Sequence, residues 1–201
     1  MTSRVLITGG AGFIGSHVAR ALLQRGVEVR VLDNLLDQVH PPNAPRNPIL
    51  DHVEFVEGDV RDADAVARCL VGVDKIVHLA AEVGVGQSMY RIERYVSVND
   101  LGTGVLFQAL TANPVARIVV ASSMSVYGEG LYRAADGRLV DNAVRPAQRH
   151  RLGWDPVDAN GEPLVPVATP EWKSPTLASV YAITKYVQER LTLTVAPTYG
   201  M

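Results

Sequence analysis

Residues 8–17 read TGGAGFIGSH, with a glycine at every third position from Gly9 to Gly15. The apolar run RVLIT (4–8) before this stretch predicts a strand, and GFIGSHVARALLQRG (12–26) predicts a helix. A nucleotide pyrophosphate needs close backbone approach and the free N–H groups of a helix N-terminus, which glycines permit. The stretch therefore indicates a phosphate-binding turn, although a tight strand–helix turn without a ligand would have the same glycines.

Outward from this turn, short β-branched runs alternate with helical patterns. The further predicted strands are 27–33, 53–59, 74–80 and 117–122, and the further predicted helices are 62–71, 88–112 and 177–195. Strands that alternate with helices indicate parallel βαβ units with right-handed crossovers. The sequence predicts an α/β fold, a Rossmann-type doubly wound parallel sheet, in one domain over 1–201. An irregular insertion at about 128–176, rich in proline and glycine, interrupts it.

Acidic residues follow two of the predicted strands. Asp33 ends the second strand, eighteen residues beyond Gly15, where a carboxylate can accept hydrogen bonds from ribose hydroxyls. Asn34 follows, and no arginine stands there to hold a 2′-phosphate, which favours NAD over NADP. Asp59 ends the third strand at the sheet edge where ligands bind, and a turn or helix-cap role explains it equally well.

The composition excludes several classes of protein. The net charge is −2, so nothing indicates a nucleic-acid or anionic membrane partner. The single cysteine, Cys69, permits no disulfide framework. Glycines interrupt the apolar N-terminus, and no apolar run is long enough to span a bilayer. We expect a cytoplasmic protein.

The segment SVYAITKYVQER (179–190) places Tyr181 and Lys185 four residues apart, on one face of a predicted helix. A phenol has an ordinary pKa of about 10, too high for an efficient base at neutral pH. A nearby ammonium favours the phenolate and lowers that pKa. The pair therefore indicates a proton-transfer site, whereas a chance surface pair is the alternative.

Seven motifs occur in one order along nearly the whole chain: TGGAGFIG (8–15), LDN (32–34), GDVRD (58–62), HLAA (78–81), VNDLGT (98–103), SSMSVYG (122–128) and YAITK (181–185). Together they resemble the extended short-chain dehydrogenase/reductase family. The resemblance implies that Ser123, Tyr181 and Lys185 are catalytic.

The same resemblance implies a set of residues around the dinucleotide. They are Gly9, Gly12, Phe13, Ile14, Gly15, Asp33, Asn34, Asp59, Val60, Leu79, Ala80, Ala81, Asn99, Tyr181 and Lys185. Asn99 could equally be a buried amide that ties a helix to the sheet. We interpret His78 as a core residue rather than a metal ligand, and Trp154 and Trp172 as anchors of the insertion rather than pocket residues.

The segment around Ser123 bears on the reaction. In this family, 4,6-dehydratases carry a threonine and two acids there, whereas Ser123-Met124-Ser125 has no carboxylate to assist loss of water. The segment resembles the sugar-nucleotide 4-epimerases, which implies NAD-dependent epimerisation at C4 of a UDP- or dTDP-linked sugar through a 4-keto intermediate. A dehydrogenase or reductase of the same family and a non-catalytic dinucleotide-binding protein are the alternatives. The resemblance also implies a homodimer formed through 88–112 and 177–195.

The insertion is similar to that of dTDP-L-rhamnose 4-epimerase-like enzymes, in which cysteines form a metal-binding knuckle. No cysteine lies in 128–176, so we expect no metal. Members of the family continue into a C-terminal substrate-binding portion, which we expect to be missing from this chain. We therefore predict little turnover from these residues alone, because remote binding energy orients the reacting carbon.

Overall fold

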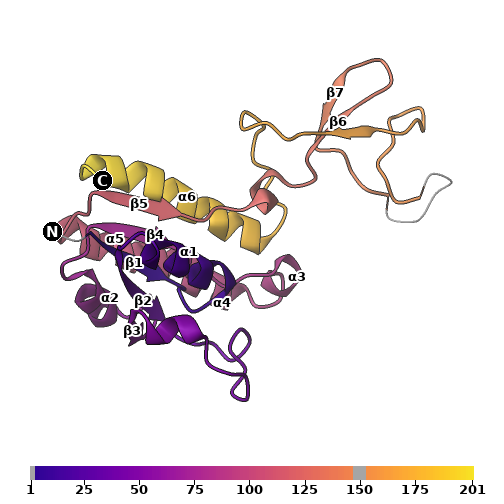
Figure 1. Ribbon diagram of the computed structural model, residues 1–201. Helices are drawn as coiled ribbons and strands as arrows, with labels where there is room; N and C mark the ends of the chain where they lie inside the picture. Colours follow the sequence, from indigo (N-terminus) through magenta and orange to yellow (C-terminus); the bar gives the residue numbers. More distant parts are fainter. Residues whose placement is uncertain (1–2, 147–152) are drawn as a thin grey trace.

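The computed structural model describes residues 3–146 and 153–201. A parallel sheet of five strands, in the order β3-β2-β1-β4-β5, forms the centre of the molecule (Figure 1). Its strands are β1 (Arg4–Thr8), β2 (Glu28–Asp33), β3 (Glu54–Glu57), β4 (Lys75–His78) and β5 (Arg117–Val120). The chain runs outward from β1 in both directions, as the prediction of a doubly wound sheet requires.

Helices connect the strands at the predicted places. They are α1 (Phe13–Leu23), α2 (Ala63–Leu70), α3 (Val85–Ser88), α4 (Ile92–Tyr95), the π-helical segment η2 (Val96–Leu101), α5 (Gly102–Ala112) and α6 (Val180–Thr198). Two 3₁₀ turns, η1 (Pro48–Asp51) and η3 (Met124–Tyr127), complete the set. No helix in the described part of the chain is long and apolar enough to cross a bilayer.

The predicted helix over 88–112 is right for Ile92–Ala112, where α4, η2 and α5 run on without a break, and wrong at its start. There the chain forms the short α3 and then a bend at Arg91, whose ψ of 42° is not helical. The π-helical turn carries one extra residue per turn, a distortion that is common at functional sites.

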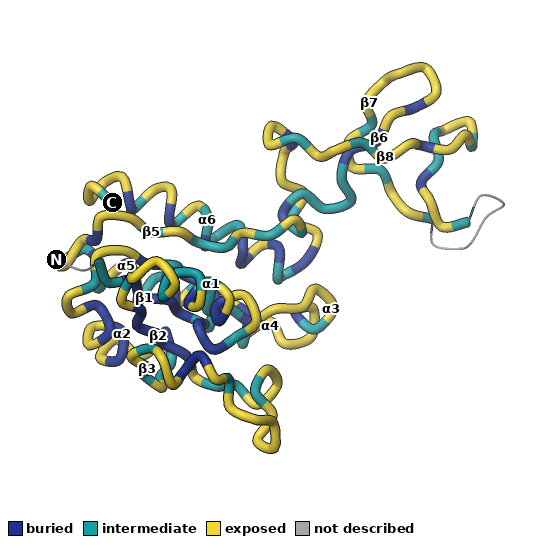
Figure 2. The backbone as a smooth tube through the Cα atoms, in the orientation of Figure 1, coloured by how far each residue is buried: buried dark blue, intermediate teal, exposed yellow. Residues whose placement is uncertain are grey.

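Helices and turns cover both faces of the sheet by packing on apolar residues that alternate along its strands. On one face, Leu6 and Leu32 pack against α2, α5 and the C-terminal part of α6. On the other face, Val5 and Val31 pack against α1 and η1. Figure 2 shows that the buried residues are concentrated in the central strands and on the inner sides of these helices. Side chains of a strand alternate between faces, so one run of apolar residues supplies both layers.

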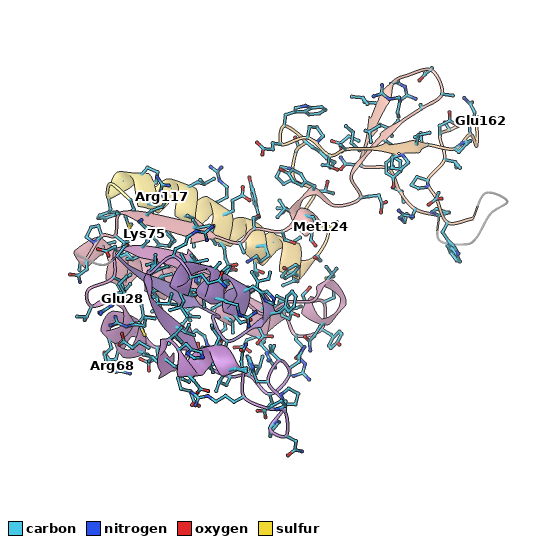
Figure 3. The ribbon with its side chains drawn as sticks, in the orientation of Figure 1. Glu28, Arg68, Lys75, Arg117, Met124 and Glu162 are labelled. Carbon is cyan, nitrogen blue, oxygen red and sulfur yellow. The ribbon has the colours of Figure 1, made fainter. Side chains whose placement is uncertain are left out.

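The insertion, residues 128–176, is not wholly irregular. It contains a second, antiparallel sheet in the order β7-β6-β8, built from β6 (Leu131–Arg133), β7 (Leu139–Asp141) and β8 (Val165–Val167). The insertion projects from the body, which comprises residues 3–127 and 177–201, and Figure 3 labels Met124 at its base and Glu162 near its outer end. The side chains of Trp154 and Trp172 are exposed, so the prediction that they anchor the insertion is wrong.

A buried lysine lies where the insertion joins the body. The Lys173 side chain is fully buried; its Nζ donates to the carbonyl O of Tyr127 at 2.7 Å and pairs with Asp141 Oδ1 at 2.8 Å. Nζ also lies 3.2 Å from Thr176 Oγ1. One ammonium thus joins η3, β7 and the segment that leads into α6.

Candidate active site

A cavity of about 380 Å³ lies at the carboxyl ends of the parallel strands. All but one of the residues predicted to surround a dinucleotide line it. These are Gly9, Gly12, Phe13, Ile14, Gly15, Asp33, Asn34, Asp59, Val60, Leu79, Ala80, Ala81, Tyr181 and Lys185. The carboxyl edge of an open α/β sheet is the usual place for a ligand, since loops diverge there to leave a crevice.

Gly9, Gly12 and Gly15, in the turn after β1, lack side chains for different reasons. A Cβ on Gly15 would lie 2.4 Å from the carbonyl O of Gly9, and Gly9 itself has a φ of +69°. Both are therefore fixed by the packing of the turn. A Cβ on Gly12 would meet only one atom, at 3.4 Å, so packing alone would permit a side chain there. The absence of a side chain at Gly12 keeps the cavity open beside the N-terminus of α1, as a pyrophosphate requires.

Asp33 ends β2 at the cavity and is nearly buried. Its Oδ2 accepts the N–H of Ala11 at 3.0 Å, and its Oδ1 accepts the N–H of Leu35 at 3.0 Å. His40 Nε2 lies 3.9 Å from Oδ1. Each carboxylate oxygen has a further lone pair, so Asp33 can still accept from ribose hydroxyls while it holds the glycine turn against β2.

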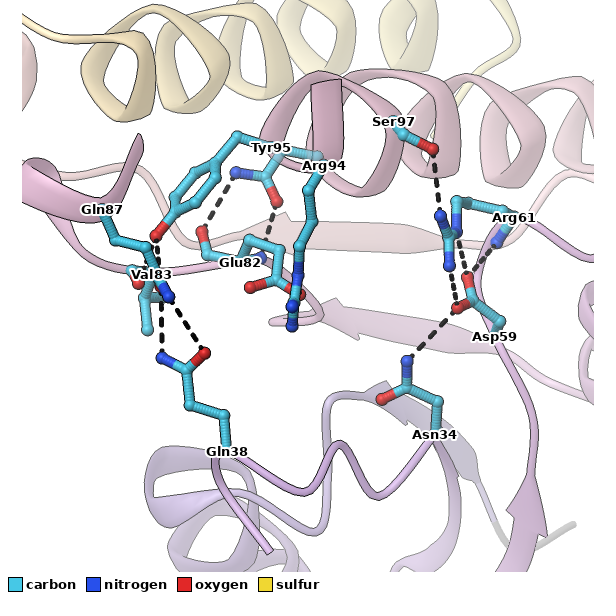
Figure 4. A network of polar contacts seen from close by, with 11 residues as sticks. Asn34, Gln38, Asp59, Arg61, Glu82, Val83, Gln87, Arg94, Tyr95 and Ser97 are labelled. Carbon is cyan, nitrogen blue, oxygen red and sulfur yellow. Dashed lines mark hydrogen bonds and ion pairs between the residues drawn. The ribbon is translucent and has the colours of Figure 1, made fainter. Parts of the chain in front are cut away.

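Asp59 and Asn34 form a second polar group on the wall (Figure 4). The guanidinium of Arg61 donates to both carboxylate oxygens of Asp59, at 2.9 and 2.8 Å, and Asn34 Nδ2 donates to Oδ2 at 3.2 Å. The hydrogen bonds from Arg61 hold the pKa of Asp59 below its usual value of 3.8. Asp59 is therefore a fixed acceptor at neutral pH.

Tyr181 and Lys185 come to the cavity from the first turns of α6. Ser179 caps this helix by accepting the N–H of Ala182 at 3.1 Å, and the N–H of Tyr181 donates to Ser88 Oγ at 3.0 Å. Lys185 is buried, and burial lowers its pKa from 10.5 to about 8. The ring of Tyr181 packs edge-on against Tyr95, 6.4 Å between centroids. Tyr181 and Lys185 both line this cavity.

Ser123 lies at the base of η3 and lines a neighbouring cavity of about 500 Å³. Its Oγ accepts the N–H of Ser125 at 3.1 Å, which leaves its proton free to donate. Ser122 lines both cavities, and its hydroxyl donates to Glu189 Oε2 at 2.7 Å. The two cavities thus meet at Ser122, a residue for which the sequence predicted no role.

Asn99 does not line the cavity. Its Oδ1 accepts the N–H of Glu82 at 2.7 Å, and its Nδ2 donates to the carbonyl O of Glu82 at 3.1 Å and to Thr184 Oγ1 at 2.9 Å. This geometry favours the reading of a buried amide that ties η2 to the end of β4 and to α6. His78, 1 % exposed, is a core residue as predicted.

Part of the wall was not predicted. Leu36, Val39 and His40, from the loop after β2, line the cavity opposite the segment after β4. Figure 4 shows how these segments are joined: Gln38 and Gln87 exchange hydrogen bonds of 3.2 and 3.3 Å through their amides. The loop has no periodicity that would have placed these residues, and only its position after Asp33 could have indicated them.

Comparison with known proteins bears on this site. The model of a family described as "NAD dependent epimerase/dehydratase family" matches residues 5–148. A dTDP-L-rhamnose 4-epimerase of Burkholderia thailandensis is 38% identical over 196 residues, 94% of this chain and 52% of that relative. A dTDP-glucose 4,6-dehydratase of Streptomyces niveus is 40% identical over 131 residues, 62% of this chain and 39% of that relative.

Solved structures share the fold. The UDP-glucose 4-epimerase from Brucella ovis in complex with NAD superposes with a TM-score of 0.68 at 25% identity, over 100% of this chain and 50% of that one. The chain spans about half the length of this structure and of the Burkholderia relative.

Proposed function

Because the chain belongs to the NAD dependent epimerase/dehydratase family, we propose that it takes part in the epimerisation of a nucleotide sugar at C4. The observation that carries the proposal is that Tyr181 and Lys185 line the same cavity as the glycine turn and Asp33. NAD, the cofactor on which the family depends, supplies when bound a reversible hydride acceptor, so that a C4 carbon can lose and regain its hydrogen on opposite faces.

The residues of the cavity fit a dinucleotide. The open space at Gly12 and the unpaired N–H groups at the start of α1 would receive the pyrophosphate. Asp33 would accept hydrogen bonds from the adenosine ribose. Phe13 and Ile14 are 80% and 60% exposed, and the cofactor would cover them. We keep these residues, with Asp59 and Lys185, as the proposed NAD site.

In the proposed reaction, Tyr181 takes the proton of the C4 hydroxyl and returns it after the sugar has exposed its other face. The Lys185 ammonium on the same wall stabilises the negative charge that develops on the reacting oxygen. Ser123 donates a hydrogen bond to that oxygen. No carboxylate occurs in Ser123-Met124-Ser125, so dehydration lacks an acid in this segment and epimerisation is favoured.

The decisive experiment compares the wild type with Tyr181→Phe. Because we predict little turnover from these residues alone, each is incubated at high protein concentration for many hours with NAD and UDP- or dTDP-hexoses, and the C4 epimer is measured by NMR. We expect the variant to bind NAD normally and to lose at least about 100-fold in rate, because one proton-transfer group is removed. Unchanged epimer formation by Tyr181→Phe would contradict the proposal, and stoichiometric release of NADH by the wild type would identify a dehydrogenase instead.

The neighbouring serines provide a matched pair of variants. We expect Ser123→Ala to slow epimer formation about tenfold or more, since one hydrogen bond to the negatively charged reacting oxygen is worth about 1.5 kcal/mol or more. Ser122→Ala should have a smaller effect, because its hydroxyl is committed to Glu189. The reverse order of the two rates would assign the role to Ser122.

The substrate and the assembly are also proposals. We propose a UDP- or dTDP-linked sugar, a homodimer formed through α4–α5 and α6, and a cytoplasmic location. Mass spectrometry of ligands released by denaturing the purified protein would identify the nucleotide, and light scattering would give the oligomeric state. Recovery of a monomer at high protein concentration would contradict the dimer.

A further inference from the structure

The Lys185 ammonium is held by one particular side chain. Lys185 is 3% exposed, and its Nζ donates to Gln188 Oε1 at 2.6 Å. Gln188 lies one helical turn further along α6 and is itself 1% exposed. A buried ammonium requires hydrogen-bond acceptors, because it has lost its water and can only donate. The glutamine oxygen therefore determines where the charged end of Lys185 lies.

The amide of Gln188 can take only one orientation. The Thr103 hydroxyl donates to the carbonyl O of Asn99 at 2.6 Å, so its oxygen can only accept other bonds. Gln188 Nε2 lies 2.8 Å from this oxygen and donates to it. A flipped amide would place its NH₂ group against the Lys185 ammonium, donor against donor.

His78 supports this arrangement from β4. Its Nε2 lies 2.9 Å from Thr103 Oγ1, which can only accept, so this nitrogen carries the proton. Its Nδ1, 2.7 Å from Thr8 Oγ1, then accepts the hydroxyl proton of Thr8. Burial, and secondarily the charge of Lys185, lowers the pKa of His78 to about 3, so the ring is neutral. The network therefore orients Gln188 without bringing a second charge to Lys185.

We propose that Gln188 is a positioning residue that holds the Lys185 ammonium at the cavity wall beside Tyr181. Thr103 and His78 fix the amide, and the amide fixes the lysine. The contact between Gln188 and Lys185 is a property of the chain itself. Its importance for catalysis rests on the proposed function, in which Lys185 acts with Tyr181.

Three lysines in the sequence make the contact directly measurable. In protein labelled with [13C]lysine, NMR would follow the side chains of Lys75, Lys173 and Lys185 as the pH is raised. In Gln188→Met, which keeps the volume but removes the acceptor, we expect the pKa of Lys185 to fall by about one unit, because the charged form loses its hydrogen bond. The matched control is Gln108→Met, at an exposed glutamine of α5 that should leave this pKa unchanged. Equal Lys185 titrations in the two variants would overturn the proposal.

Gln188→Glu keeps the oxygen acceptor and adds a negative charge. We expect it to raise the pKa of Lys185 above the wild-type value, and it decides the question if Gln188→Met does not fold. The other titratable groups around Lys185 are His78 on β4, whose Nε2 lies 3.3 Å from Gln188 Nε2, and Tyr181 on α6, which lines the same cavity. Both residues are kept in these variants. A Lys185 titration that stays at the wild-type position in Gln188→Glu would refute the positioning role.

None of these titrations requires NAD or sugar, so they separate the two proposals. A chain in which the Lys185 titration follows the Gln188 variants but which binds no NAD would support the positioning role and contradict the proposed function. If NAD binds and epimer forms but the pKa of Lys185 is the same in the wild type and the Gln188 variants, the proposed function stands and the positioning role fails.

Discussion

In the body of the molecule, two large apolar clusters cover the two faces of the parallel sheet. In the insertion, the buried apolar cluster consists of Tyr132, Ala134 and Leu164, with two partly buried neighbours. Figure 2 shows the same contrast, since buried backbone is frequent in the body and sparse in the insertion. With so few buried apolar side chains, this small sheet gains little free energy from apolar burial.

Polar contacts replace apolar burial in the insertion. Lys173 joins three segments at its base, and Arg145 pairs with Glu129 at 2.8 Å and with Asp155 at 3.2 Å. The exposed pairs of Arg145 add little net free energy because water screens them, and the gain from the buried Lys173 pair is offset by the hydration that the ammonium loses. The comparison teaches that apolar burial stabilises the parallel sheet, whereas polar contacts mainly fix the geometry of the insertion, so the two regions should differ in their sensitivity to mutation.

The largest expected effect is a cavity in the body. Leu106 on α5 is fully buried in the cluster beside α2, so Leu106→Ala should reduce the free energy of unfolding by about 3 kcal/mol. The matched variant in the insertion, Leu139→Ala, removes a side chain that is 43% exposed and should cost less than about 1 kcal/mol. Urea unfolding measures both, and equal losses would show that the insertion is packed like the body.

A smaller and more local effect is expected at the base of the insertion. Lys173→Met removes the buried ammonium and leaves Asp141, whose side chain is 39% exposed and can regain water, so the loss should be about 2 kcal/mol. Hydrogen exchange should become faster in β6, β7 and β8 while the parallel strands stay protected. The control is Lys75→Met at an exposed lysine of β4. Unchanged protection of the short strands would contradict the ionic account.

The smallest expected effect sharpens the contrast, because it concerns a partly buried carboxylate in the body, that of Asp100. Asp100 Oδ1 in η2 is buried without a hydrogen bond among the described residues, and burial raises the pKa of Asp100 from 3.8 to about 6. Because the pKa of Asp100 is higher in the folded protein, its protonated form stabilises the fold fully below pH 3.8. This contribution is lost as the pH rises through about 6. Asp100→Asn should therefore be more stable by about 1 kcal/mol at pH 8, after allowance for partial exposure, with no gain near pH 4.

Chemical unfolding of Asp100→Asn at the two pH values checks this, with Asp37→Asn, at an exposed carboxyl, as the control. A gain of the same size at pH 4 and pH 8 would mean that the charge of Asp100 is not the cause.

The sequence predicted the body better than the insertion for a physical reason. Apolar runs of four to six residues that alternate with amphipathic helices carry a periodic signal, and all five parallel strands lie where it occurs. The strands β6, β7 and β8 have three residues each, too few for an alternation to be recognised. The break between α3 and α4 was missed because helical periodicity continues across it.

The site was predictable where residues follow strands. Gly9, Asp33 and Asp59 are far apart in the sequence, but the carboxyl ends of parallel strands meet at one edge of the sheet. The roles of Lys173 and Gln188 were not predictable. A lysine among prolines has the pattern of an exposed loop, and a glutamine on an amphipathic helix has that of its solvent face. Only tertiary packing shows that both side chains are buried.

The two ends of the insertion lie side by side. A Cβ on Gly128 would be 2.8 Å from Thr176 Cβ, and the N–H of Thr176 donates to the carbonyl O of Val126 at 3.0 Å. A segment that departs and returns at one point can be lengthened, shortened or exchanged without moving the framework on either side. Natural variation can therefore remodel the surface next to Ser123 separately from the cavity at the carboxyl ends of the parallel strands, and a laboratory chimaera could graft a relative's segment at the same junction.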